Sequence, residues 1–128
     1  MGLTGYATNM SYLDPHILRD TFAGAQFALS ELQPDGITYT AVNLTGCTVL
    51  IQFRKSHNTA VVMEWSTADA SITIPNPLTG VILMKGREIN IPVAGEYVYD
   101  VELTYANGTV ETLFQDSWEI RNDISRRS

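Results

Sequence analysis

The chain has little of what most catalytic and metal-binding sites are built from. Its 128 residues include one cysteine and two histidines. With Cys47 alone, an intramolecular disulfide and a paired-cysteine metal or redox site are excluded. The two histidines, His16 and His57, have no partners at the spacing of a metal or nucleophile motif, and no phosphate-binding glycine loop is present. We therefore expect no enzyme activity, no catalytic residue, no cofactor and no bound metal.

Positive charge and long apolar runs are also scarce. Eight Lys and Arg stand against 14 Asp and Glu, which gives a formal net charge of −6. A nucleic-acid binder usually carries a basic patch, because neutralising phosphates dominates its affinity. No run approaches the roughly 18 apolar residues of a membrane-spanning helix, and the first 20 residues do not resemble a signal peptide. We expect neither nucleic acid nor membrane as a partner, and folding in a cytoplasm.

What the sequence does have, from Thr21 onward, is the alternation of β-strands. Apolar and polar residues alternate most clearly along Cys47–Arg54 and Glu96–Tyr105. Turn residues separate the segments at short intervals, and Asn107-Gly108 is the strongest short hairpin signal available. The further predicted strands are 21–29, 37–44, 60–65, 71–74, 81–85 and 109–120. We predict one all-β domain over residues 21–121.

The two ends of the chain have a different composition. Residues 1–20 hold scattered apolar side chains without a sustained period, so we predict an extended N-terminal arm. Residues 122–128 are polar and are predicted to be a C-terminal tail. Exposed aromatic and apolar side chains anchor protein interfaces well. The candidate partner-docking residues are Leu3, Tyr6, Met10, Tyr12, Leu13 and Trp118.

One local motif indicates the type of sandwich. Gly95-Glu96-Tyr97 resembles the Gly-x-Tyr step of immunoglobulin-like domains, in which the tyrosine hydroxyl binds the backbone a few residues upstream. Cys47 on an early strand and Trp65 after a hairpin loop fit the same plan, although the usual disulfide is missing. The prediction is a single antiparallel Ig-like β-sandwich of about 7–9 strands.

A longer series of motifs resembles the Ig-like domain of tailed-phage virion proteins, and is similar to the N-terminal domain of baseplate upper proteins. The motifs, in order, are Asp20-Thr21-Phe22, 43–49, 52–54, 71–74, 79–82, 95–103 and 107–110. The resemblance implies a structural component of a tailed-bacteriophage virion, an adaptor in a tail, baseplate or fibre attachment. It further implies location in the virion and docking to other virion proteins, as a homo-oligomer or in a ring.

Two other functions remain open at this stage. Aromatic residues make up 9% of the chain. Trp65 and Trp118 near loops are consistent with a carbohydrate-binding β-sandwich module, because exposed rings stack on sugars. The third possibility is another Ig-like interaction module, such as a component of a bacterial surface or secretion system. Fold alone does not decide among these functions.

Overall fold

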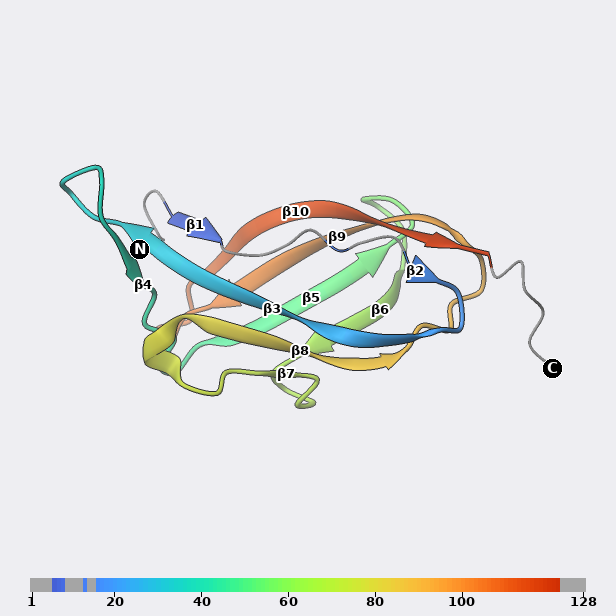
Figure 1. Cartoon of the computed structure of the whole chain (residues 1–128), viewed down its shortest axis with the longest axis horizontal. Helices are drawn as coiled ribbons and strands as arrows, with labels where there is room; N and C mark the ends of the chain where they lie inside the picture. Colours follow the sequence, from blue (N-terminus) through green and yellow to red (C-terminus); the bar gives the residue numbers. More distant parts are fainter. Residues whose placement is uncertain (1–5, 9–12, 14–15, 123–128) are drawn as a thin grey trace.

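The computed structural model describes residues 6–8, 13 and 16–122. Two β-sheets face each other across a shared core (Figure 1). Sheet I contains β1 (Tyr6–Thr8), β3 (Thr21–Leu32), β4 (Tyr39–Ala41), β7 (Ile72–Thr73) and β8 (Val81–Glu88). Sheet II contains β2 (His16–Ile17), β5 (Thr48–Arg54), β6 (Val61–Ser66), β9 (Gly95–Thr104) and β10 (Val110–Arg121).

The strand order explains how the sheets are built. Sheet I runs β1-β3-β8-β7, with β4 also paired to β3, and sheet II runs β2-β10-β9-β5-β6. All pairs are antiparallel except β2 with β10. The helical content of the described part is one 3-10 turn, η1 (Pro77–Thr79), and no helix there is long and apolar enough to span a membrane. The predicted all-β sandwich is confirmed, and residues 6–8 and 16–122 contain ten strands in place of about 7–9.

Two short strands fall within residues 1–20, where the sequence predicts an arm. β1 pairs with the end of β3, and β2 pairs with the end of β10. The parts of this segment that the structure describes therefore extend the two sheets. Of the predicted tail, the structure describes only Asn122.

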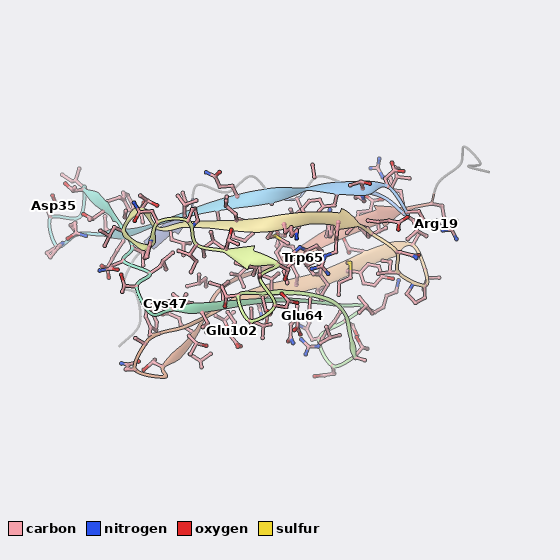
Figure 2. The ribbon with its side chains drawn as sticks, turned by 90° about the horizontal axis from the view of Figure 1, so that it is seen from below. Arg19, Asp35, Cys47, Glu64, Trp65 and Glu102 are labelled. Atoms are coloured by element: carbon pink, nitrogen blue, oxygen red, sulfur yellow. The ribbon has the colours of Figure 1, made fainter. Side chains whose placement is uncertain are left out.

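An aromatic cluster fills the space between the sheets. Trp65 lies between the two layers in Figure 2 and is 0% exposed. Its ring centroid is 5.4 Å from that of Phe53 in sheet II and 5.9 Å from that of Phe22 in sheet I. Aromatic rings at such distances attract each other beyond the effect of burying their area. The cluster therefore joins the two sheets directly.

The tyrosine that the sequence singles out makes the expected contact. The Tyr97 hydroxyl donates a hydrogen bond to the carbonyl oxygen of Val93, four residues upstream. The ring is buried in the core, and the Lys55 ammonium lies 4.9 Å from its centroid. The tyrosine corner predicted at Tyr97 is confirmed, and it holds the connection from β8 against the start of β9.

The pairing of β3 with β8 contains a change of phase. On β3 the buried residues are Phe22, then Phe27 and Leu29, so the inward position moves from even to odd numbers. Gly24 lies at this change, with φ of 108°. A Cβ on Gly24 would stand 2.6 Å from the Met84 carbonyl oxygen. The backbone conformation and the close approach both require glycine.

Gly24→Ala tests this requirement against a matched substitution. Gly36 also has positive φ, 73°, but a Cβ at that position would meet no other atom within 4 Å. We expect Gly36→Ala to lower the free energy of unfolding by about 1 kcal/mol, and Gly24→Ala to lower it by about 3 kcal/mol or more. Urea denaturation of both variants measures the difference. Equal losses would show that the close approach to Met84 has no energetic role.

Candidate functional site

The structure places the predicted docking residue Trp118 in the core. Its side chain is 1% exposed, and its ring lies 5.1 Å from that of Phe22 and 5.4 Å from that of Phe53. Trp118 pairs with the inward-facing Tyr97 across β9 and β10, so both point to the same side of sheet II. The prediction that Trp118 anchors a partner is wrong, because no partner can reach its ring.

The other predicted docking residues do not form a site together. Leu13 is partly buried and packs against the core. Tyr6 belongs to β1, whose backbone pairs with β3. Leu3, Met10 and Tyr12 lie outside the described residues. For residues 1–20, the docking site predicted from the sequence therefore stays a prediction.

The burial of both tryptophans also removes the basis of the carbohydrate-binding alternative. That alternative needs rings at the surface, on which a sugar can stack. Trp65 is 0% exposed and donates its indole N–H to the Lys85 carbonyl oxygen at 2.8 Å. The Arg87 guanidinium covers its ring, 3.8 Å from the centroid. Neither tryptophan offers a sugar-binding platform.

His16 is held at one edge of the aromatic cluster. Its ring lies 5.7 Å from that of Trp118 and 6.1 Å from that of Phe22. Nε2 is 2.9 Å from the carbonyl oxygen of Asp20, a contact that needs a proton on that nitrogen. Burial lowers the pKa of His16 below its usual 6.5, because the charged ring is poorly solvated there.

Two further side chains with shifted pKa values are Cys47, which is partly buried against the core, and Asp69, which is exposed in the turn after β6. Burial raises the pKa of the Cys47 thiol, which favours the unreactive protonated form. Asp69 closes the turn after β6, accepting hydrogen bonds from the Ser71 backbone N–H at 2.9 Å and from its hydroxyl at 2.5 Å. The Ser71 hydroxyl lowers the pKa of Asp69. Both residues have structural contacts and no nucleophile–base geometry.

The most exposed large apolar side chain of the described part, Ile37, lies instead on the β3–β4 hairpin, together with the half-exposed Tyr39. Ile37 is 82% exposed in the turn, and Tyr39 is 52% exposed at the start of β4. The hairpin extends beyond the pairing of β3 with β8, which ends at Ala28 and Val81. Figure 1 shows it projecting at one end of the sandwich. We call residues 33–41 the hairpin tip.

Asp35 holds the hairpin tip in one shape. Its carboxylate accepts hydrogen bonds from the backbone N–H groups of Ile37 at 2.9 Å and Thr38 at 2.8 Å, and from the Thr38 hydroxyl at 2.6 Å. These contacts, the Thr38 hydroxyl first, lower the pKa of Asp35. The Gln33 N–H also donates to the Thr38 carbonyl across the turn, at 2.8 Å. The turn therefore presents Ile37 in a fixed position.

Strand β4 is an open edge of sheet I. It pairs with β3 alone among the described strands. Hydrogen bonds between Val42 and Leu29 and between Gln33 and Thr38 flank the ladder. Antiparallel bonding alternates along a strand, so Thr40 bonds to β3 while the N–H and C=O groups of Tyr39 and Ala41 point away from it. These outward backbone groups are available for adding another strand.

The sequence marks this exposed surface by its turn residues, whereas its apolar–polar alternation predicts only a strand. Gln33-Pro34-Asp35-Gly36 predicts the turn correctly, and Ile37 to Leu44 reads as a strand. The strand observed is only Tyr39–Ala41, and all three of its residues are exposed. An apolar residue directly after a tight turn, ahead of the paired strand, is the pattern that marks Ile37 as exposed.

Comparison with known proteins gives structural matches only. Neither a protein-family model nor a curated protein sequence matches the chain. CopC from Methylosinus trichosporium OB3b matches with 8% identity and a TM-score of 0.50, over 96% of this chain and 98% of CopC. The soluble domain of PmoD from Methylocystis sp. (Rockwell) matches with 12% identity and a TM-score of 0.42, over 91% and 90%.

A third matching structure is murine CRIg, an Ig-like protein, with 9% identity and a TM-score of 0.40, over 94% of this chain and 99% of CRIg. At these identities a likeness concerns the fold, and only the CopC match reaches a TM-score that supports an argument. It supports the β-sandwich over nearly the whole chain.

The predicted role in a tailed-phage virion is wrong, and so is the predicted location in a virion. The structure that matches nearly the whole chain with a TM-score of 0.50 is CopC, a copper-handling domain, and no virion protein is among the three matches above. The motifs behind the phage resemblance are turns and strand starts, such as Leu44-Thr45-Gly46. Such turns occur in β-sandwiches of many kinds, so they do not distinguish a phage protein.

The residues that the structure describes do not fit a copper site. Copper is held by several His, Cys, Met or carboxylate side chains together. In the described ranges no three His, Cys, Asp or Glu side chains gather. Met63 and Met84 are buried among apolar core residues, and His16 is engaged by Asp20. The likeness to CopC therefore does not extend to a metal-binding side-chain set in this part of the chain.

The lowered pKa of His16 predicts a pH dependence of stability. The unfolded chain takes up a proton at the ordinary pKa of 6.5, before the folded protein does. Stability is therefore complete above that pH and falls as the pH drops through and below it. We expect wild type to lose more stability than His16→Gln between about pH 7.5 and pH 5.5. Urea denaturation at both pH values, with His57→Gln as control, tests this; equal losses in all three proteins would contradict it.

Copper addition tests the comparison with CopC directly. A ligand at about 100 times its dissociation constant stabilises a protein by about 2.7 kcal/mol, which raises the melting temperature by several degrees. We expect excess Cu(II) or Cu(I) to leave the melting temperature within about 1 °C of the value with a chelator. A larger rise that His16→Gln or His57→Gln abolishes would show a copper site and overturn this expectation.

Proposed function

We propose that this domain is a non-catalytic assembly module whose copies pair through the β3–β4 hairpin tip. The observation that carries the proposal is the open edge of β4, with Ile37 and Tyr39 exposed beside it on a turn fixed by Asp35. Two such edges can join in antiparallel pairing about a two-fold axis, which is the commonest symmetry of homodimers.

The backbone supplies the register of the pairing. Tyr39 and Ala41 both direct their N–H and C=O groups away from β3. In a two-fold antiparallel pair centred on Thr40, Tyr39 of one copy stands opposite Ala41 of the other. The two residues then exchange both of their backbone hydrogen bonds. Sheet I would continue across the two copies through this ladder.

The side chains supply the free energy. Complete burial of an Ile or an aromatic side chain stabilises a complex by about 1.5–3 kcal/mol. The Asp35 hydrogen bonds hold the tip in its bound shape beforehand, which reduces the entropy lost on association. The paired strand is only three residues long. We therefore expect a weak dimer, with a dissociation constant on the order of 100 µM.

Charge opposes the pairing and predicts its salt dependence. Each chain carries a formal net charge of −6, and Glu31 and Asp35 lie on the hairpin itself. Two copies brought together at this end repel each other, and salt screens that repulsion. Dimerisation should therefore strengthen as the ionic strength rises. An interface held by ion pairs would show the opposite dependence.

The absence of catalysis is part of the same proposal. Support comes from the described reactive side chains, which have structural contacts: Cys47 has a raised pKa, Asp69 closes a turn, and His16 packs in the aromatic cluster. Support for a partner other than nucleic acid comes from the scarcity of Lys and Arg, eight in the chain. A membrane partner is not part of the proposal.

Light scattering after size exclusion tests whether the domain forms dimers through the hairpin tip. We expect wild type to shift from monomer toward dimer as its concentration passes about 100 µM, and the double variant Ile37→Thr, Tyr39→Thr to stay monomeric. Both substitutions remove exposed apolar surface and place the β-branched, strand-compatible Thr at each position.

Val93→Thr is the matched control for the hairpin variant. Val93 is 59% exposed in the loop between β8 and β9, away from the hairpin tip. The control should dimerise like wild type. A wild type that stays monomeric up to millimolar concentration, or a hairpin variant that dimerises like the control, would overturn the proposal.

A further inference from the structure

The outer face of sheet II carries a hollow of about 160 Å³ that none of the functions above uses. Gln52 and Arg54 of β5, Asp100 of β9 and Gln115 of β10 line it, together with His57 from the loop between β5 and β6. This is the side of sheet II turned away from the core, on which Glu64 and Glu102 are seen in Figure 2. Four strand residues and one loop residue thus converge on one space.

The strand register explains why a hollow forms here. Gln52, Asp100 and Gln115 stand side by side across β5, β9 and β10. In the neighbouring row, Arg54 stands beside Val98, whose partner on β10 is Ser117. Val98 and Ser117 have short side chains, and long polar side chains surround them. The space above Val98 is therefore left open.

Two of the lining residues, Arg54 and Gln52, are held by hydrogen bonds at the edge of the hollow. The Arg54 Nε donates to the Thr59 carbonyl oxygen at 3.0 Å, and its Nη2 to the Gln52 Oε1 at 3.3 Å. Gln52 in turn donates from Nε2 to the Glu64 Oε1 at 2.9 Å. The guanidinium is fixed in place by these bonds, and Nη1 remains available for a ligand.

The other polar groups of the hollow have no hydrogen-bond partner in the described part of the chain. These are the Asp100 carboxylate, the His57 ring and the Gln115 amide. Arg54 and Asp100 also form no ion pair with each other, since the one ion pair among the described residues joins Arg121 and Glu119. A cation and an anion thus line one small space without neutralising each other.

We propose that this hollow binds a small zwitterion of the α-amino acid type. The ligand's carboxylate would lie against Arg54 and His57, and its ammonium group against Asp100, with the Gln115 amide as a further partner. A guanidinium binds a carboxylate through parallel charge-assisted hydrogen bonds, and a carboxylate accepts from an ammonium group in the same way. A simple anion or a simple cation would satisfy only one of the two charged walls.

Size and polarity favour this class of ligand over larger molecules. Sites for drug-sized ligands measure about 300–1,000 Å³ and are mostly apolar. The hollow, at about 160 Å³, is below that range. Besides the polar side chains, only Val98 and Tyr99 line it. Such a space fits a molecule of a few heavy atoms with a polar group at each end.

The site is independent of the proposed assembly surface. The loop that carries His57 lies at the end of the sandwich opposite the β3–β4 hairpin (Figure 1). Substitutions at the hairpin tip should leave binding at the hollow unchanged. Failure of one proposal is therefore distinguishable from failure of the other.

Calorimetry and NMR titration of the whole chain with glycine, L-alanine and L-serine test the site. We expect saturable binding of these zwitterions, with amide shifts concentrated at Gln52, Asp100 and Gln115. Asp100→Asn should weaken the binding at least tenfold, and Gln115→Ala should weaken it by a smaller factor. Neither side chain makes a hydrogen bond in the described part, so both variants should fold.

Glu102→Gln is the matched control, because Glu102 lies two residues along β9 on the same outer face but does not line the hollow. It removes the same charge and should leave the binding unchanged. Acetate, ethylammonium and glucose serve as comparison ligands. The proposal is overturned if acetate or ethylammonium alone binds as tightly as the amino acids, if glucose binds in their place, if Glu102→Gln weakens binding like Asp100→Asn, or if no ligand shifts the amides of the hollow.

Discussion

The packing of aromatic rings between the sheets is the interaction on which the rest of the structure depends. Phe53 stacks on Tyr99 within sheet II at 4.8 Å, and Phe22 of sheet I reaches both Trp65 and Trp118. Phe22 can point inward only because the strand changes phase at Gly24, a position that admits no side chain. Backbone geometry in one sheet thus sets the contact that joins the two sheets.

Because most of the described aromatic side chains are buried in the core, few are left at the surface to contact a partner. Among the aromatic side chains that the structure describes, Tyr39 is the one with a largely exposed ring. It stands beside Ile37 on a hairpin that Asp35 holds in shape. The proposed apolar docking surface and the loop that borders the polar hollow lie at different ends of the molecule, and each has its own chemistry (Figure 1).

The sequence predicts the elements whose signals are local. Strand β9, its tyrosine corner at Tyr97 and the Asn107-Gly108 turn follow from alternation and turn chemistry, and all three are present. The burial of Trp118 could not be read from the sequence, because the pairing of β10 shifts between Thr112 and Phe114 and this irregularity changes which residues of the strand point inward. The polar hollow requires residues from three strands in register, and single-strand patterns contain no such information.

The central claim is that the outward backbone groups of β4 pair with a second copy of the chain, and amide hydrogen exchange measures those groups individually. Exchange is followed for Tyr39, Thr40 and Ala41 in dilute and in concentrated protein. The account predicts that Tyr39 and Ala41 exchange more slowly at high concentration, while Thr40, already bonded to β3, changes little. Exchange of Tyr39 and Ala41 at the same rate in both samples would contradict it.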